Sequence, residues 1–291
     1  MRSIKNSLGI DIGGTSIKVG YVPGPGARCL GFRSYPTPKT QAGLKALLTT
    51  IVGEYHRRYS VRRIGIGCPG PLDVKRGLIL VTPHLPWRNF AIRKFLEQIS
   101  RLSVAMDNDA NAFTLAEATW GAGRGYGNVI GLTLGTGVGG GIVINGKLYH
   151  GRCYAGELGY LLQNIKGPRG PLGERGSIQE YARLGSLLRS TLGRGRALID
   201  VKTLAQDKSR AAESAWQKFG QVLGYAIASL THVLDPDIVI LGGQIAKTWP
   251  RFYPTLKQTL KQNCIFPQPP LVSRARLGDQ AGVIGAALLT N

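Results

Sequence analysis

Short apolar runs alternate with longer segments of helical periodicity along this chain of 291 residues. Residues 7–12 and 17–22 are strongly apolar, which predicts two strands joined by a tight turn. In residues 40–59 the apolar side chains recur at helical spacing, which predicts an amphipathic helix. The same patterns predict further strands over 63–67, 102–106, 129–134, 142–144 and 238–241, and further helices over 90–99, 109–118, 178–192, 213–234 and 279–289. This alternation indicates an α/β fold.

Three of the predicted strands end in glycine-rich turns, at residues 13–16, 135–141 and 242–243. Glycine lets backbone N–H groups approach a ligand closely, and concave arrays of such groups bind phosphate. Asp11 ends the first strand and could hold the magnesium ion that accompanies a nucleotide. Each turn alone could be a plain tight turn or hairpin. Three of them favour a nucleotide-binding cleft, although none has the spacing of the common phosphate-loop or dinucleotide motifs.

The composition of the chain favours a globular protein over a membrane or secreted protein. With 43% hydrophobic residues, the chain can form one large domain or two moderate ones. No apolar run approaches the roughly 20 residues of a membrane span, and the first strand is expected too near the N-terminus to leave room for a signal peptide. The four cysteines, Cys29, Cys68, Cys153 and Cys264, are scattered, as reduced thiols would be. We expect a cytoplasmic protein without membrane association.

The formal net charge of +21 favours anionic ligands, including nucleotides and nucleic acids. The basic residues are spread along the chain, with modest local densities at 57–63 and 183–210. No helix-turn-helix pattern or basic stripe with interleaved aromatic residues precedes the first strand. A generally basic surface is therefore favoured over specific nucleic-acid binding.

The order of elements suggests two similar α/β halves. We expect a smaller N-terminal domain over residues 1–110 and a larger C-terminal domain over 111–291, with the terminal helix 279–290 able to pack back on the first domain. Ligands in such architectures bind beyond the carboxyl ends of the strands, where the glycine turns lie. A cleft between the two domains is the expected site.

Five motifs occur along the chain, namely 11–15 (Asp-Ile-Gly-Gly-Thr), 67–71 (Gly-Cys-Pro-Gly-Pro), 108–111 (Asn-Asp-Ala-Asn), 135–140 with 155–159 (Ala-Gly-Glu-Leu-Gly), and 241–243 (Leu-Gly-Gly). In this order and over nearly the whole chain, they resemble the ROK family of sugar kinases, within the two-domain actin-like ATPase fold. Some members are repressors with an N-terminal DNA-binding domain. This sequence begins directly at the first glycine turn, so it is similar to the kinase branch.

The resemblance implies ATP-dependent, magnesium-assisted phosphorylation of a hexose at its 6-hydroxyl. Asp109 would be the general base, and Asn108 would bind a neighbouring hydroxyl; otherwise both would simply cap a helix. Glu157 would bind sugar hydroxyls, and Gly70 would let the backbone approach the sugar. The residues implied at the nucleotide are Asp11, Gly13, Gly14, Thr15, Lys18, Thr136, Gly137, Gly139, Gly242 and Gly243.

Two departures from the family pattern affect the implied sugar site. Tyr160 stands where many members have a histidine, and Gln179 stands where a sugar-binding glutamate is usual; both could still bind a hydroxyl. The cysteines of the family's structural zinc site are also missing from 167–179, where Ser177 takes the place of one. Zinc needs about four clustered ligands, so we predict none, and the nearby His150 and Cys153 are interpreted as incidental.

The leading hypothesis is a glucokinase. N-acetylhexosamine, fructose or allose kinase remain alternatives, as does a non-catalytic sugar-binding regulator of the same fold. A polyphosphate donor would suit the positive charge, although the turn at 242–243 favours ATP.

We also expect a homodimer, for which Gly220 and Gly224, one helical turn apart, could provide close helix packing.

Overall fold

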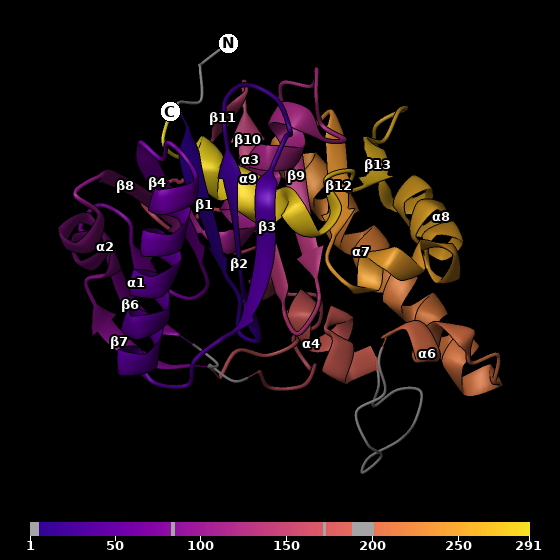
Figure 1. Ribbon diagram of the computed structural model, residues 1–291. Coiled ribbons are helices and arrows are strands. Elements are labelled where there is room, and N and C mark those ends of the chain that lie inside the picture. The colour runs from indigo at the N-terminus through magenta and orange to yellow at the C-terminus, as the bar shows by residue number, and fades with distance from the viewer. Residues whose placement is uncertain (1–5, 83–84, 171–172, 188–200) are drawn as a thin grey trace. The chain divides into compact units, whose positions relative to one another are not determined.

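The structure is a computed structural model that describes residues 6–82, 85–170, 173–187 and 201–291 (Figure 1). The strands are β1 (Ser7–Ile12), β2 (Ser16–Val22), β3 (Leu30–Pro36), β4 (Arg63–Cys68), β5 (Leu72–Asp73), β6 (Leu78–Thr82), β7 (Leu85–Phe90), β8 (Ser103–Asn108), β9 (Val129–Leu134), β10 (Val138–Ile144), β11 (Lys147–Leu148), β12 (Ile238–Gly242) and β13 (Leu271–Arg274). The α-helices are α1 (Gln41–Arg58), α2 (Ile92–Ser100), α3 (Asp109–Trp120), α4 (Ile178–Ala182), α6 (Val201–Gln206), α7 (Arg210–Leu234), α8 (Tyr253–Asn263) and α9 (Ala281–Leu288), with 3-10 helices η1 (Leu158–Tyr160), η2 (Ile245–Arg251) and η3 (Gly278–Gln280).

The chain divides into two compact units, each built from separate stretches of sequence. Unit 1 contains 1–125, 147–155 and 276–291, and unit 2 contains 126–146 and 156–275. This division differs from the expected boundary after residue 110, because α3 belongs to unit 1. Its backbone lies so close to α9 that a Cβ on Gly285 would stand 1.8 Å from the carbonyl oxygen of Ala112.

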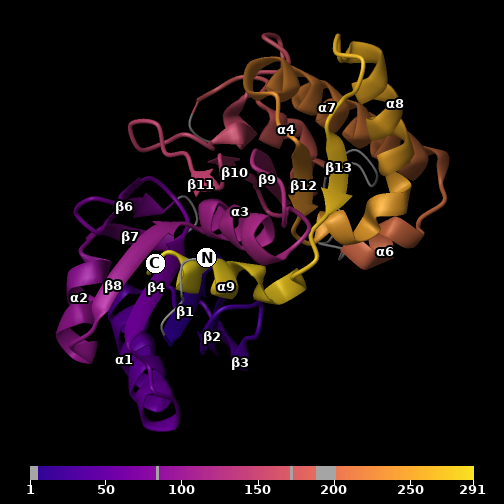
Figure 2. The ribbon, with the colours of Figure 1, turned by 90° about the horizontal axis from the view of Figure 1, so that it is seen from above.

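Unit 1 is organised around a five-stranded sheet of order β3-β2-β1-β4-β8. Strand β1 runs antiparallel to β2 and parallel to β4, and β4 runs parallel to β8. Figure 2 shows α9 on one face of β1 and β4, with α1 on the other. The carboxyl ends of β1, β4 and β8 meet at one edge, which brings together residues near positions 11, 67 and 108.

The face of this sheet that contacts α9 is glycine-rich because the helix backbone lies directly on it. A Cβ on Gly9 would stand 2.0 Å from the carbonyl oxygen of Val283, and one on Gly65 would stand 1.7 Å from that of Ala286. The opposite face carries large apolar side chains such as Ile10, which join the buried stripe of α1 in the core. The alternation of glycine and isoleucine in β1 and β4 follows from these two different partners.

Unit 2 contains the second sheet, of order β11-β10-β9-β12-β13, and a core with stacked and edge-on aromatic rings at Trp216, Phe219 and Phe252. Helix α7 packs closely on α8: a Cβ on Gly224 would stand 2.6 Å from the Cβ of Thr259, and one on Gly220 would stand 2.5 Å from the carbonyl oxygen of Phe252. The small-residue pair therefore serves helix packing inside the unit, and the homodimer stays a prediction without its support.

Several elements differ from those that the pattern predicts. The helix expected over 178–192 is interrupted, because Arg183 has the extended angles φ −85° and ψ 156°; its end lies outside the described residues. The hairpin β6–β7 follows the Cys68–Pro71 turn and was not predicted.

Among the described residues, no helix is both long enough and apolar enough to cross a membrane.

Candidate active site

Two predicted carboxylates come together at the carboxyl-end edge of the unit 1 sheet. Asp11 lies in β1, and Asp109 begins α3 directly after β8. Between them, β4 contributes Gly67: a Cβ there would stand 3.4 Å from Asp109 Cα and 3.8 Å from Asp11 Oδ1. On the other side, a Cβ on Gly282 of α9 would stand 2.3 Å from Asp11 Oδ2. Gly282 therefore gives the Asp11 carboxylate room at this edge, and Gly67 lies between the two acidic residues.

Burial raises the pKa of both carboxyl groups, and repulsion from Asp109 adds to the shift at Asp11. The pKa of Asp11 is raised to about 7, first by burial and then by the charge of Asp109, and Lys18 on β2 opposes the shift. Burial also raises the pKa of Asp109 to about 6, against the backbone N–H of Ala110, which donates to its Oδ1 over 2.9 Å. A carboxylate with a pKa near neutrality is suited to accept a proton at physiological pH.

Asn108 caps helix α3, which is the alternative to sugar binding that the sequence offered for this residue. Its Oδ1 accepts from the backbone N–H groups of Ala110, at 2.8 Å, and Asn111, at 3.3 Å. Capping uses only the side-chain oxygen of Asn108. The amide nitrogen takes no part in the cap and is a hydrogen-bond donor. Capping and donation to a sugar hydroxyl are therefore compatible roles for this residue.

The first glycine turn is a hairpin connection held by residues that follow β3. The N–H of Gly13 donates to the carbonyl of Ser16 over 2.9 Å. The hydroxyl of Thr37 donates to the carbonyl of Gly13 over 2.7 Å, and its N–H donates to that of Thr15 over 3.0 Å. Gly14 and Thr15 are exposed at the tip. The N–H of Gly13 is thus engaged within the turn, and the exposed tip is the part that can face a phosphate.

Two other predicted residues of unit 1 have defined positions. Gly70 adopts φ +96° between two prolines, in the left-handed region that favours glycine. Lys18 pairs with Asp11 across the β1–β2 register, so its ammonium group shares the environment of the two carboxylates.

In unit 2, three predicted residues gather beside the second glycine turn. A Cβ on Gly137 would stand 3.5 Å from Gln179 Oε1. The pKa of the Tyr160 phenol is raised, first by burial and also by the nearby carboxylates of Glu157, Glu174 and Glu180. A hydrogen bond with the side chain of Gln179 opposes the shift. The residues implied at the sugar by the family resemblance, Glu157, Tyr160 and Gln179, therefore share one neighbourhood within this unit.

The second glycine turn is shorter than predicted. Strand β10 begins at Val138, so Gly139 lies in the strand opposite Thr133, and the turn itself consists of residues 135–137, with Thr136 exposed. The following glycines provide space instead: a Cβ on Gly140 would stand 2.6 Å from the carbonyl oxygen of Gly156. They let the segment that carries Glu157 and η1 lie directly on β10.

The third turn lies against the second. Gly242 ends β12 opposite Thr133 of β9, and Gly243 has φ +85°. A Cβ on Gly243 would stand 2.3 Å from the carbonyl oxygen of Leu134, the residue before the second turn. The fold of unit 2 thus brings the two turns together, as a shared nucleotide site requires.

Comparison with known proteins decides the family. Residues 7–291 match the ROK family. The chain belongs to this family. A glucokinase from Halalkalibacterium halodurans is 31% identical, over 97% of this chain and 94% of its own length. An N-acetyl-D-glucosamine kinase from Vibrio atlanticus is 33% identical, over 97% of this chain and 98% of its own.

A solved structure extends the likeness to the fold. The ROK family glucokinase from Streptomyces griseus, in complex with glucose and AMPPNP, superposes with a TM-score of 0.85 at 30% identity, covering 98% of this chain and 99% of its own. The predicted α/β, actin-like ATPase fold and the predicted family are therefore confirmed.

The loop that would hold structural zinc is closed here by the backbone. Leu162 and Ser177 form a β-bridge, and the N–H of Gly176 donates to the carbonyl of Pro168 over 2.8 Å. Ser177 is fully buried, and its hydroxyl has no hydrogen-bond partner among the described residues. Within the described part of the chain, no three His, Cys, Asp or Glu side chains cluster as metal ligands would.

We expect the purified ROK protein to contain no stoichiometric zinc, because a zinc site requires about four N, S or O ligands in a tetrahedral array. Elemental analysis by plasma mass spectrometry measures this directly. Dialysis against a strong chelator should leave the thermal unfolding midpoint unchanged. One full equivalent of zinc, lost together with stability on chelation, would contradict the prediction.

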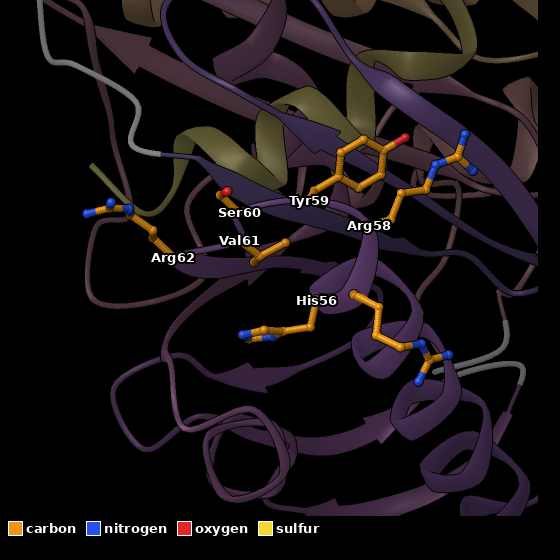
Figure 3. Close-up of a pocket in the computed structure, with 7 residues that line it drawn as sticks. His56, Arg58, Tyr59, Ser60, Val61 and Arg62 are labelled. Atoms are coloured by element: carbon orange, nitrogen blue, oxygen red, sulfur yellow. The ribbon is translucent and has the colours of Figure 1, made fainter.

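A basic pocket lies away from the carboxylates. It has a volume of about 370 Å³ and is lined by His56, Arg57, Arg58, Tyr59, Ser60, Val61 and Arg62 (Figure 3). The pocket adjoins the beginning of β4, where Arg63 pairs with Ser7, at the opposite end of the strands from Asp11. Figure 3 shows the side chains of Arg58 and Arg62 pointing in opposite directions, so these two do not converge on one small ligand.

Sequence reasoning missed two buried polar residues beside the candidate base. Asp107 and Asn111 are each 3% exposed, and Asn111 Nδ2 donates to Asp107 Oδ1 over 2.9 Å. Asp107 lies in β8 and Asn111 in the first turn of α3, so helical spacing could not have indicated this contact. The pattern around them was assigned to capping and catalysis, which left these two side chains without a role.

Proposed function

We propose that this ROK protein is a sugar kinase that transfers the terminal phosphoryl group of ATP to the 6-hydroxyl of a hexose, with glucose as the first candidate. The observation that carries the proposal is the pair Asp11 and Asp109 around Gly67, with a candidate base whose pKa is raised toward neutrality. Phosphoryl transfer requires little covalent chemistry from the protein beyond positioning, charge neutralisation and a base. The relatives that act on glucose support the choice of sugar.

In this proposal Asp109 accepts the proton of the attacking hydroxyl, and the amide of Asn108 donates to a neighbouring one. Gly70, Glu157, Tyr160 and Gln179 would contribute to sugar binding. Exposed backbone N–H groups of the glycine turns would bind the phosphates, because successive N–H groups in a tight turn form a concave array of donors. The residues proposed at the nucleotide are Asp11, Gly13, Gly14, Thr15, Lys18, Thr136, Gly137, Gly139, Gly242 and Gly243.

The donor set at Asp11 fits a magnesium ion. Magnesium prefers carboxylate oxygen and keeps several waters, so one carboxylate and the phosphates suffice to hold it. Asp11 carries an unfavourable negative charge beside Asp109, which Lys18 only partly offsets. When bound, the cation would neutralise charge on the transferred phosphate. Asp11 is therefore the residue proposed to hold it, directly or through water.

A coupled assay for ADP release with magnesium and ATP tests the function. The panel should contain glucose, N-acetylglucosamine, N-acetylmannosamine, fructose, allose and a control without sugar. Release that depends on glucose supports the proposal, and a preference for N-acetylglucosamine would favour the alternative suggested by the Vibrio relative. No release with any sugar, from folded protein, would leave a polyphosphate donor, testable by replacing ATP, or a sugar-binding regulator.

We expect kcat/KM for glucose to rise with pH through about 6 to 7 and then level off. Asp109 must be ionised to accept a proton, and its pKa is raised to about 6, so the enzyme is inactive in the protonated form below that value. Because Asp11 titrates nearby, the acidic limb of the kcat/KM profile gives apparent pKa values that belong to the pair Asp11 and Asp109, not to one residue. Initial rates between pH 5 and 8.5 measure this dependence. Values of kcat/KM that stay level down to pH 5, as for a carboxylate with an ordinary pKa near 4, would contradict the shift.

A further inference from the structure

His150 contacts the turn that presents the candidate base, from a separate segment of unit 1. It lies in residues 147–155, and its Nε2 is 2.6 Å from Asp107 Oδ2. The carboxyl group of Asp107 is buried, and its other oxygen accepts from the N–H of Asn108 over 2.7 Å and from Asn111 Nδ2 over 2.9 Å. One carboxylate therefore joins this segment to the end of β8 and the first turn of α3.

The contact between His150 and Asp107 is an ion pair when the imidazole is protonated. The pKa of His150 is raised, first by the hydrogen bond to Asp107, while partial burial opposes the shift. The same segment is closed on itself, because the N–H of Ala155 donates to the carbonyl of His150 over 3.2 Å. The histidine therefore begins a local hydrogen-bonded turn.

Loss of the histidine would leave a buried carboxylate oxygen without its partner. Such an oxygen carries a desolvation cost that a hydrogen bond normally offsets. Because the His150 side chain is 40% exposed, water could enter the vacated space, but water would not tie the carboxylate to residues 147–155 as the imidazole does. If the carboxylate rotated instead, its bonds to Asn108 and Asn111 would break. Asp109 is the next residue along this turn, so a shift of the turn moves the candidate base. A misplacement of about 1 Å costs about 10²-fold in rate.

We propose that His150 is a positioning residue, which acts through Asp107 to hold the Asn108–Asp109 turn in the geometry that proton abstraction requires. This inference rests on the proposed kinase function for its rate effect. It differs from a direct role at the sugar, which would change sugar affinity. It also differs from a purely structural role, which would change stability alone.

The first test compares His150→Ala, His150→Gln and Asp107→Asn with the unchanged protein. We expect kcat of His150→Ala to fall by about 10- to 100-fold, with the KM values for sugar and ATP nearly unchanged. Glutamine can still donate to Asp107, so His150→Gln should recover most of the rate. His56→Gln is the matched control, because His56 is exposed and lies on α1 in the basic pocket.

A double-mutant cycle separates action through Asp107 from action elsewhere. If both residues act through one contact, His150→Ala combined with Asp107→Asn should be no slower than the slower single variant. Multiplying effects would overturn the proposal, as would a kcat of His150→Ala within twofold of the unchanged protein or a change confined to the sugar KM. If the alanine variant does not fold, Asp107→Asn alone still tests the proposal, because it should lower kcat with the KM values for sugar and ATP nearly unchanged.

An NMR titration keeps the contact testable apart from turnover. With labelled histidine, the four imidazoles can be followed by pH and assigned by substitution. We expect the His150 signal to titrate above the usual value near 6.5, and to return to it in Asp107→Asn. A normal titration in the unchanged protein refutes the contact itself. Absence of kinase activity with the shift present refutes the proposed function and leaves the contact intact.

Discussion

Asp109→Asn will lower kcat by about 10²- to 10⁴-fold, the usual effect of removing a positioned general base. Asparagine has nearly the same shape, and its Oδ1 can still accept from the N–H of Ala110, a contact of 2.9 Å in the unchanged protein. It cannot accept the hydroxyl proton. The variant should therefore fold, bind glucose and bind nucleotide while turnover is lost. Steady-state ADP release and calorimetric binding of glucose measure the two properties separately.

Asp235→Asn provides the matched control for this prediction. Asp235 is exposed at the end of α7 and adopts φ 42°, a conformation that asparagine tolerates. The control should retain the full rate. Turnover of Asp109→Asn within a few-fold of the unchanged protein would remove Asp109 from the base role. A variant that loses glucose binding together with turnover would instead place this carboxylate mainly in substrate binding.

Gly65→Ala will strongly destabilise unit 1. The added methyl carbon would stand 1.7 Å from the carbonyl oxygen and 2.5 Å from the carbonyl carbon of Ala286 in α9. Both partners are backbone atoms of packed elements, so neither can move aside as a flexible side chain could. Overpacking a core costs about 1–3 kcal/mol, occasionally more, and we expect the upper end here. Urea unfolding followed by circular dichroism measures the change.

The control for the packing prediction is Gly24→Ala. No atom lies within 4 Å of a Cβ at Gly24, and its φ is not in the left-handed region. Alanine there should leave stability unchanged or raise it slightly, because it restricts the unfolded chain. Equal midpoints for the two variants would show that α9 does not press on β4 as closely as described. Loss of folding only in Gly65→Ala supports the close contact.

Local features of the sequence predicted much of this protein. The apolar runs at 7–12 and 129–134 are strands with nearly the expected bounds, and the stripe over 40–59 is α1. These succeed because alternation and helical spacing are recorded within a few neighbouring residues. The five motifs that identified the ROK family are also short, so each can be recognised from a few neighbouring residues. Failures occurred where local signals are ambiguous: the glycines after Val138 were expected in a loop and lie in β10, because their role is to admit a neighbouring backbone.

The strand and helix pattern, the glycine turns and the residue types at the candidate site are all recorded in the order of residues along the chain. Which of these residues meet depends on how the chain packs. Asp11 and Asp109 share an edge because β1, β4 and β8 are parallel neighbours, and their mutual repulsion exists only in that arrangement. His150 reaches Asp107 across 43 positions of sequence. Such contacts depend on chain packing over long separations, which no local pattern of hydrophobic and polar residues encodes.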